Sequence, residues 1–183
     1  MPFAVVLDTC VLYPAHLRDT LLRLAERGLY QALWSADILT ELHRNLVEVG
    51  IRSDTVDYLH AEMQGAFPEA EVTGYHTAMH SMTCDPKDRH VLAAAVRSDA
   101  AAIVTFNVAD FPAPSVNPYK IDVIHPADFL LDLLDLAPSI VITELNSQAT
   151  ANRRAPKTLN GLLEALSRAG VPSFTDQARR QTG

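Results

Sequence analysis

Short apolar runs of strand length alternate along this chain with segments of helical periodicity, and no other feature of the sequence restricts its fold as much. We expect strands over residues 4–7, 101–105 and 121–124, and a weaker one near residues 32–34. Strands that are joined through helices run in parallel, because the crossover returns the chain to the same end of the sheet. The alternation therefore predicts an α/β protein with a mostly parallel sheet covered by helices.

Helix signals fill the segments between these strands. Helices are expected over residues 18–27, 36–49, 54–65, 126–136 and about 144–149. Ser35 suits the N-cap of the second helix, and glycine follows the first two helices directly, as is common at helix C-termini.

The chain changes character near residue 147, where it becomes polar and more basic before a short apolar pattern over residues 159–166. A segment of fewer than about 40 residues rarely folds by itself. We therefore expect one domain over residues 1–145, with residues 146–183 as a helical extension packed on or near the same core.

Composition excludes several classes of protein. Of the 183 residues 48% are apolar and only 7 are glycine, so the chain is neither disordered nor collagen-like. No apolar run approaches the roughly 20 residues of a spanning helix, and no basic leader precedes the first strand. Cys10 and Cys84 form no C-x-x-C pair. We expect a cytoplasmic protein without a membrane partner.

Charge is distributed unevenly. The formal net charge is −7, with −11 on residues 1–150 and +4 on residues 151–183. An acidic body with a basic tail suits a metal site with a phosphate-holding arm, and it equally suits a solvated surface with a soluble end. Charge does not decide between these two interpretations.

Polar and acidic residues recur where parallel sheets bind ligands. Asp8 directly follows the first strand, while Asn107 and Asp110 follow the strand over 101–105. Ligands of open α/β sheets bind beyond the carboxyl ends of the strands. Glu41 and Asn45 lie one turn apart on a border of the apolar stripe of their helix.

Another acidic residue lies at the start of a further helix. Asp85 before Pro86 is typical of an N-cap followed by a first-turn proline. Asp88 is then the third residue of the helix and points along its apolar stripe. Capping therefore explains Asp85 but not Asp88.

Each acid also has a local explanation, as a turn cap, a helix-border glutamate, a complement to a helix dipole or a turn former. Four converging carboxylates would nevertheless repel one another without a counter-charge, and a divalent cation resolves that repulsion. Oxygen ligands suit Mg²⁺ or Mn²⁺. Such a site supports metal-assisted hydrolysis of phosphodiesters.

Other enzyme classes fit less well. A haloacid-dehalogenase-like phosphatase needs a second aspartate where Cys10 stands, and a cysteine phosphatase needs C-x5-R where Arg18 gives C-x7-R. His76 and His80 lack the H-E-x-x-H pattern of zinc proteases. Neither G-x-G-x-x-G nor a Walker loop occurs.

Four segments in order resemble PIN-domain ribonucleases, especially the larger relatives of the VapC-type toxins of bacterial toxin–antitoxin pairs. They are VLDTCVL at 6–12, ILTELHRNL at 38–46, DPKDRHVLAAA at 85–95 and IVTFNVADF at 103–111. The likeness covers about residues 3–135. It implies a three-layer α/β/α PIN-like fold and an Mg²⁺- or Mn²⁺-dependent endoribonuclease that leaves 5′-phosphate and 3′-hydroxyl ends.

The resemblance also implies roles for residues. The acidic, metal-binding set comprises Asp8, Glu41, Asp88 and Asp110. Water or substrate is expected to be positioned by Thr9, Asn45, Thr105 and Asn107. Because many family members carry Asp where Asn107 stands, the fourth metal position is open between Asn107 and Asp110. Candidate cations for RNA phosphates, each equally explained as a solvated helix side chain, are Arg18, Arg44, Arg89, Arg153 and Arg154.

The expected partners are RNA, an antitoxin protein whose tail blocks the acidic pocket, and a second copy of the chain. The alternative is a PIN-like module that binds RNA or a protein without cutting. An intact carboxylate set argues against this alternative, because a module that does not cut has no need of four costly acids.

Overall fold

The computed structural model describes residues 2–183, whose contacts divide into two compact units. The first unit contains the chain up to Tyr13 together with Tyr30–Ile124. The second contains Pro14–Leu29 together with His125–Gly183. The chain therefore leaves the first unit after Tyr13, returns to it at Tyr30 and leaves it again after Ile124.

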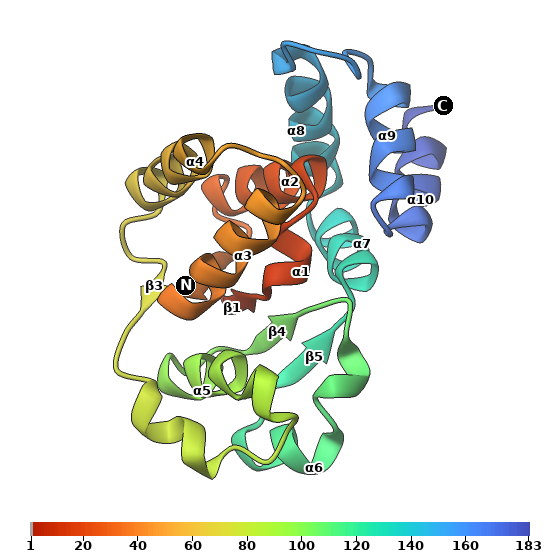
Figure 1. The fold of residues 1–183 in the computed structure, drawn as a ribbon. Coiled ribbons are helices and arrows are strands. Elements are labelled where there is room, and N and C mark those ends of the chain that lie inside the picture. The colour runs from red at the N-terminus through yellow and green to blue at the C-terminus, as the bar shows by residue number, and fades with distance from the viewer. Residues whose placement is uncertain (1) are drawn as a thin grey trace. The chain divides into compact units, whose positions relative to one another are not determined.

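The first unit is built on a parallel sheet (Figure 1). Five strands are found within residues 2–183, in the order β3-β2-β1-β4-β5, and every pairing between them is parallel. They are β1 (Ala4–Leu7), β2 (Gln31–Ser35), β3 (Glu71–Val72), β4 (Ala102–Val104) and β5 (Asp122–Ile124). The prediction of a mostly parallel sheet is confirmed.

The strand order creates a switch point beside β1. The chain runs from β1 outward through β2 to β3 and then crosses to the other side of β1 to form β4 and β5. In register, Val6 of β1 lies opposite Leu33 of β2 and Ile103 of β4. Ligands of open α/β sheets bind at such a point, outside the carboxyl ends of the strands. Asp8 and Thr105 follow the two strands that border it.

Helices cover the sheet on both faces, which confirms the three-layer α/β/α prediction. In Figure 1 α3 lies above β1 and β4, whereas α5 lies below them. α3 packs against β2, and α5 packs against β1, β2 and β4. The helices of this unit are α1 (Thr9–Leu12), α3 (Ala36–Glu48), α4 (Ser53–Ala66), α5 (Arg89–Arg97) and α6 (Ala113–Val116).

Burial on both faces explains the composition of β1. Val5, Val6 and Leu7 are all inaccessible to solvent, as expected of a central parallel strand. The start of α3, directly after β2, is fixed by Ser35. Its hydroxyl accepts a hydrogen bond of 3.2 Å from the Ile38 amide and so caps α3 as predicted.

Several elements differ from prediction, among them β3 and the start of α5. β3 was not expected, because a strand of two residues leaves no periodicity to detect. The helix expected from Pro86 begins instead as a 3-10 turn over Pro86–Asp88, and α5 begins at Arg89. Asp85 does cap the turn, but Asp88 is the residue before α5 and not the third residue of the helix.

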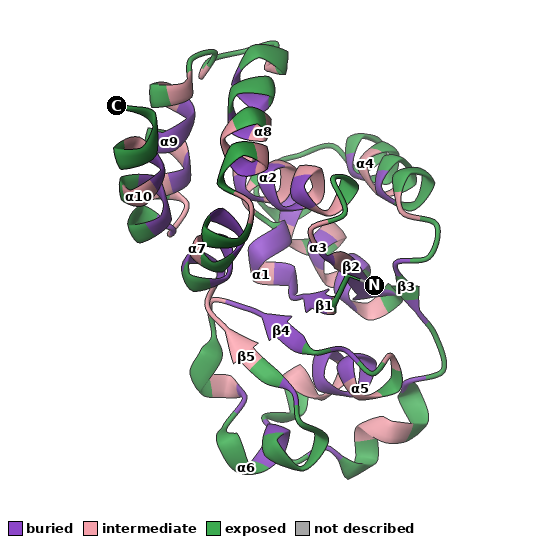
Figure 2. Cartoon of the chain, turned by 180° about the vertical axis from the view of Figure 1, so that it is seen from behind, coloured by how far each residue is buried: buried purple, intermediate pink, exposed green. Residues whose placement is uncertain are grey.

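The second unit, over residues 14–29 and 125–183, is helical, as predicted for the C-terminal extension. Its elements are α2 (Ala15–Glu26), α7 (Pro126–Leu136), α8 (Pro138–Ala151), α9 (Leu159–Arg168) and α10 (Pro172–Thr182). α8 packs against α2, α7 and α9, and α10 packs against α7 and α9. Figure 2 shows the buried face of each helix turned toward its neighbours.

The predicted boundary between residues 145 and 146 lies inside α8. The polar stretch that suggested it starts in the last turns of α8, where Gln148 is buried, and continues beyond the end of the helix at Ala151. The helix begins at Pro138 and is longer than the expected 144–149. Within residues 2–183, no helix is both long and apolar enough to cross a membrane.

A buried amide joins α2 to α8. Gln148 is fully buried, and its Oε1 accepts a hydrogen bond of 2.7 Å from the Thr20 hydroxyl. Its Nε2 donates to the His16 carbonyl at 3.0 Å. Both ends of the amide are therefore satisfied, which offsets the cost of burying it.

We predict that Gln148→Ala lowers the free energy of unfolding by about 2–4 kcal/mol, because it leaves a cavity and deprives two buried polar groups of their partner. Urea denaturation followed by circular dichroism measures this. Ser147→Ala, on the exposed side of the same helix, serves as the control and should change stability by less than about 0.5 kcal/mol. Equal losses in the two variants would contradict the prediction.

Candidate active site

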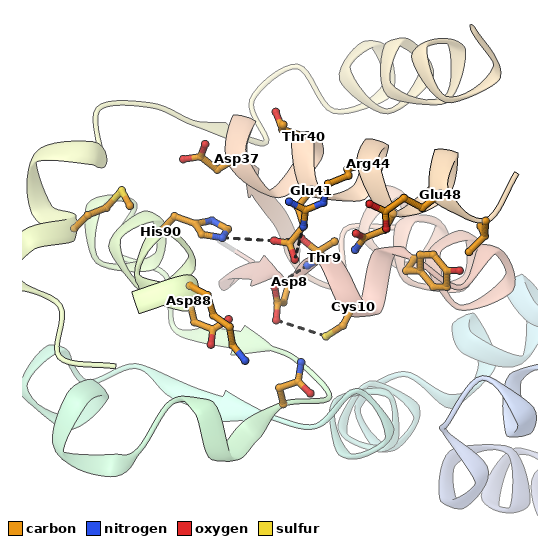
Figure 3. A pocket seen from close by; sticks show the side chains of 16 residues that line it. Asp8, Thr9, Cys10, Asp37, Thr40, Glu41, Arg44, Glu48, Asp88 and His90 are labelled. Atoms are coloured by element: carbon orange, nitrogen blue, oxygen red, sulfur yellow. Dashed lines mark hydrogen bonds and ion pairs between the residues drawn. The ribbon is translucent and has the colours of Figure 1, made fainter. Parts of the chain in front are cut away.

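A cavity of about 840 Å³ lies beside the carboxyl end of β1 (Figure 3). Seven residues singled out from the sequence line it: Asp8, Thr9, Glu41, Arg44, Asn45, Asp88 and Asn107. Nine lining residues had been given no role: Cys10, Tyr13, Asp37, Thr40, Glu48, Val49, Met79, Lys87 and His90. Side chains from β1, α1, α3 and the start of α5 thus meet at one place.

Asp8 is fixed by hydrogen bonds to both carboxylate oxygens. Its Oδ1 accepts from the Thr9 amide at 2.7 Å, and its Oδ2 accepts from the Thr105 hydroxyl at 2.8 Å. The Asp8 amide itself donates to the Val104 carbonyl of β4. Asp8 therefore does cap α1, but the strand switch also holds its carboxylate in one orientation at the cavity wall.

Thr105 acts through Asp8. The family resemblance implied that Thr105 positions water or substrate. In the structure its side chain is fully buried and is not among the described lining residues of the cavity, so its contact is with Asp8. Its hydroxyl oxygen accepts a bond of 3.0 Å from the Asn107 amide while donating to Asp8. One hydroxyl thus links the turn after β4 to the carboxylate after β1, and Asn107 lines the cavity.

Glu41 and Asn45 lie along the wall formed by α3, as their one-turn spacing predicted. Glu41 Oε2 lies 3.6 Å from His90 Nε2 and 3.4 Å from the Thr9 hydroxyl, which also donates to the Ile38 carbonyl. The side chain is 37% exposed. Glu41 is therefore less tightly held than Asp8, and its oxygens remain accessible from the cavity.

Asp88 is a carboxylate without a full set of partners. Its Oδ2 is buried and has no hydrogen-bond partner among residues 2–183. Burial, reinforced by the negative charge of Asp8, raises the pKa of Asp88 to about 6, although the charge of Lys87 opposes this. Its place before α5 fits a helix-dipole complement, but its side chain makes no capping hydrogen bond. The position thus disfavours the charged carboxylate.

Asp110 differs from the other three acids. It lies close enough to Asp88 to raise the pKa of that carboxyl, but it forms an ion pair of 3.5 Å with Lys87 Nζ. This pairing raises the pKa of Lys87. Of the two candidates for the fourth metal position, Asn107 is among the described lining residues of the cavity and Asp110 is not.

Two residues that lie at the site, Cys10 and His90, had no site role predicted from the sequence. Cys10 Sγ donates to Asp8 Oδ2 at 3.5 Å, and burial, with the charge of Asp8, raises the pKa of the thiol to about 11. His90, on the first turn of α5, has a buried Nδ1 with no partner in the described part of the chain. Its position two residues after Asp88 was the available signal.

The five candidate arginines fall in different parts of the structure. Arg44 lines it, with its guanidinium 3.9 Å from Glu41. Arg89 donates to the Cys84 carbonyl at 3.4 Å and is not part of the described lining. Arg18, Arg153 and Arg154 belong to the second compact unit.

The oxygen-rich wall suits a divalent cation. Within residues 2–183, no three His, Cys, Asp or Glu side chains are close enough to hold an ion by themselves. Mg²⁺ typically takes only one or two carboxylates and completes its shell with water and substrate oxygens. Asp8 and Asp88 fit this requirement, because the buried Oδ2 of Asp88 lacks a partner that a cation would supply.

We predict a pH-dependent gain in stability for Asp88→Asn in metal-free buffer. The raised pKa means that the folded state binds this proton more tightly than the unfolded chain, where the pKa is near 3.8. Ionisation therefore destabilises the fold, with no effect below about pH 4 and the full effect above about pH 6. Thermal denaturation in EDTA should show the variant gaining stability over wild type as pH rises through this window.

The exposed Asp122→Asn change on β5 is the control and should give a difference that stays constant between pH 4 and pH 7. A constant difference for Asp88→Asn as well would show that Asp88 does not titrate abnormally.

Comparison with known proteins gives two family matches. The model described as PIN domain matches residues 4–109, and the model described as VapC50 C-terminal domain matches residues 126–180. The first contains Asp8, Glu41, Asp88 and Asn107, while Asp110 lies one residue beyond it. The second corresponds to most of the helical segment after β5.

One curated relative is a Mycobacterium tuberculosis protein named "Putative ribonuclease VapC50". It is 44% identical over 107 residues, which are 58% of this chain and 63% of the relative. The match thus spans less than two thirds of the relative's length. No solved structure matches the chain.

Proposed function

Because the chain belongs to the PIN-domain family, we propose that it is a metal-dependent endoribonuclease, the toxin of a bacterial toxin–antitoxin pair. The observation that carries the metal site is the buried, unpartnered Oδ2 of Asp88 near the rigidly held carboxylate of Asp8. The name of the mycobacterial relative supports ribonuclease activity. Asp8, Glu41, Asp88 and either Asn107 or Asp110 form the proposed site.

Asp8 and Asp88 would hold the cation, Mg²⁺ or Mn²⁺. When bound, the cation would lower the pKa of a coordinated water and stabilise the negative charge of the phosphate. The protein contributes orientation: the Thr9 amide and the Thr105 hydroxyl fix Asp8, so that its carboxylate needs little rearrangement when substrate arrives.

Glu41 is the proposed proton acceptor. Its oxygens are accessible from the cavity, and His90 and Thr9 limit its rotation. A water that loses its proton toward this carboxylate attacks the phosphorus and forms a new oxygen–phosphorus bond. The bond from phosphorus to the 3′-oxygen breaks, and this oxygen takes a proton from solvent water, which leaves 5′-phosphate and 3′-hydroxyl ends. Asn45 and Asn107 offer amides for water or phosphate oxygens.

RNA must approach an acidic cavity, so cations at its border matter. Arg44 lines the cavity with its side chain 64% exposed, and its planar guanidinium suits a phosphate. Lys87 is also exposed at the border, but Asp110 already engages it. Arg44 is also paired, but its guanidinium lies 3.9 Å from Glu41, whereas Lys87 Nζ lies 3.5 Å from Asp110. We favour Arg44 as the first phosphate contact because its pairing is longer and its planar guanidinium can bind a phosphate through two N–H groups.

The proposed protein partners follow from the same charge. An antitoxin segment that carries a cation would complement the acidic cavity and exclude RNA from it. The match to the VapC50 C-terminal domain supports placing this chain with the larger toxins. We further propose that the chain forms a homodimer with a second copy of itself and that it acts in the cytoplasm.

The first test is cleavage of a mixed RNA pool with Mg²⁺, Mn²⁺ or EDTA. We expect cutting that needs the metal and falls by at least about 10²-fold in Asp8→Asn and in Asp88→Asn, because each change removes a carboxylate ligand. Asp122→Asn, at the amino end of β5 and away from the carboxyl ends of the strands, should cut like wild type.

Circular dichroism must show that each variant remains folded. Full activity in both active-site variants would refute the site. A folded wild-type protein free of antitoxin that cuts no RNA would favour the module that binds without cutting.

The thiol beside Asp8 gives a separate prediction. Because burial raises the pKa of Cys10 to about 11, almost none of it is thiolate at neutral pH, and a nucleophilic role is disfavoured. We expect Cys10→Ala to keep cleavage within about tenfold of wild type, in contrast to Asp8→Asn. A loss as large as that of Asp8→Asn would reinstate the thiol as a catalytic group.

A further inference from the structure

A second ordered cluster lies at the end of the cavity where α3 begins. Asp37, in the first turn of α3, lines the cavity, and its Oδ2 accepts a hydrogen bond of 2.6 Å from the Tyr75 hydroxyl. The same oxygen lies 3.1 Å from His76 Nε2. The Tyr75 hydroxyl in turn accepts from the Asp37 amide at 3.3 Å. Tyr75 and His76 thus both contact the same carboxylate oxygen of Asp37.

The two rings of this cluster are stacked. Their centroids are 4.2 Å apart and their planes differ by 26°. Tyr75 is almost completely buried, and burial raises the pKa of its phenol, so the hydroxyl keeps its proton and continues to donate to Asp37. Tyr75 is therefore a fixed platform on which the imidazole of His76 rests.

His76 is exposed and yet held in place. Its side chain is 66% accessible, while one ring face lies on Tyr75 and its Nε2 is directed to Asp37. An exposed side chain normally loses conformational entropy when a ligand orders it. Here the contacts to Tyr75 and Asp37 already order the ring, so its free face can bind a flat partner at lower cost.

The chemistry of the cluster favours a nucleobase over the other ligands of histidine. A phosphate would meet the negative charge of Asp37 within about 3 Å of the ring, whereas a base carries no charge there. Zinc is disfavoured because, in residues 2–183, no group of three suitable side chains could hold it. Proteins bind unpaired bases by stacking them on aromatic rings, including histidine.

We propose that the free face of His76 stacks a nucleobase of RNA that enters the cavity, with Asp37 and Tyr75 as positioning residues. This inference rests on the proposed ribonuclease function. Asp37 and Met79, which follows His76 by one turn of the same 3-10 helix, both line the cavity. His76 itself is not among the described lining residues, so the stacked base belongs to a nucleotide at the border of the cavity.

The test uses Asp8→Asn as the parent, so that RNA binds without being cut, and a short single-stranded RNA that carries 2-aminopurine. We expect His76→Ala to weaken binding about tenfold, the order of one base–aromatic stack, and to reduce quenching of the fluorescent base. His76→Phe keeps a ring and should recover most of the affinity, whereas His76→Gln keeps a polar group without a ring and should behave like His76→Ala. Asp37→Ala should reduce quenching, because it removes the carboxylate that holds Nε2 of the imidazole.

His80→Ala is the matched control, since His80 is an exposed histidine of the same 3-10 helix. In the cutting-competent protein, His76→Ala should raise KM about tenfold and leave kcat nearly unchanged. Unchanged affinity, quenching and KM in His76→Ala would overturn this inference while metal-dependent cutting by wild type upholds the proposed function. A wild-type protein that neither binds nor cuts RNA would overturn both.

Discussion

The burial of one carboxylate beside another at the end of β1 is the constraint to which the rest of the site responds. Burial, and after it the negative charge of Asp8, disfavours ionisation of Asp88, and the charge of Lys87 opposes this only in part. Such an arrangement is rare where function does not require it, because a buried carboxylate oxygen without a partner lowers stability. The fold tolerates the cost where a cation would remove it.

The parallel sheet makes this arrangement possible. β1 and β4 are parallel neighbours, so their carboxyl ends lie side by side, and Asp8 and Thr105 meet although they are 97 positions apart in sequence. The Thr105 hydroxyl bridges Asp8 and the Asn107 amide, so one short hydrogen-bond chain orients an acid and shapes the turn that carries the next polar residue. α3 supplies the facing wall with Glu41, Asn45 and Arg44 on one side of the helix.

The same principle of fixed orientation recurs at the end of the cavity formed by Asp37. A buried phenol and a carboxylate hold the exposed imidazole of His76, much as a hydroxyl and an amide hold Asp8. Both devices order a ligand-facing group before any ligand is present, which lowers the entropy lost on binding. The cavity therefore combines a reactive centre with a neighbouring surface suited to an uncharged, flat group.

Local signals in the sequence determined the positions of β1, β2, β4 and β5, the cap at Ser35 and the acids at strand ends, because hydrophobic periodicity and capping act over a few residues. The sequence distinguished Asp88 from its capping neighbour Asp85, and in the structure Asp85 caps the turn while the Asp88 side chain makes no capping hydrogen bond. α5 begins later than predicted. Only the tertiary structure decided that Thr105 serves Asp8, that Asp110 pairs with Lys87, and that Cys10, His76 and His90 lie at or beside the cavity. Those relations depend on through-space distances and on burial, which arise when strands and helices distant in the chain pack together.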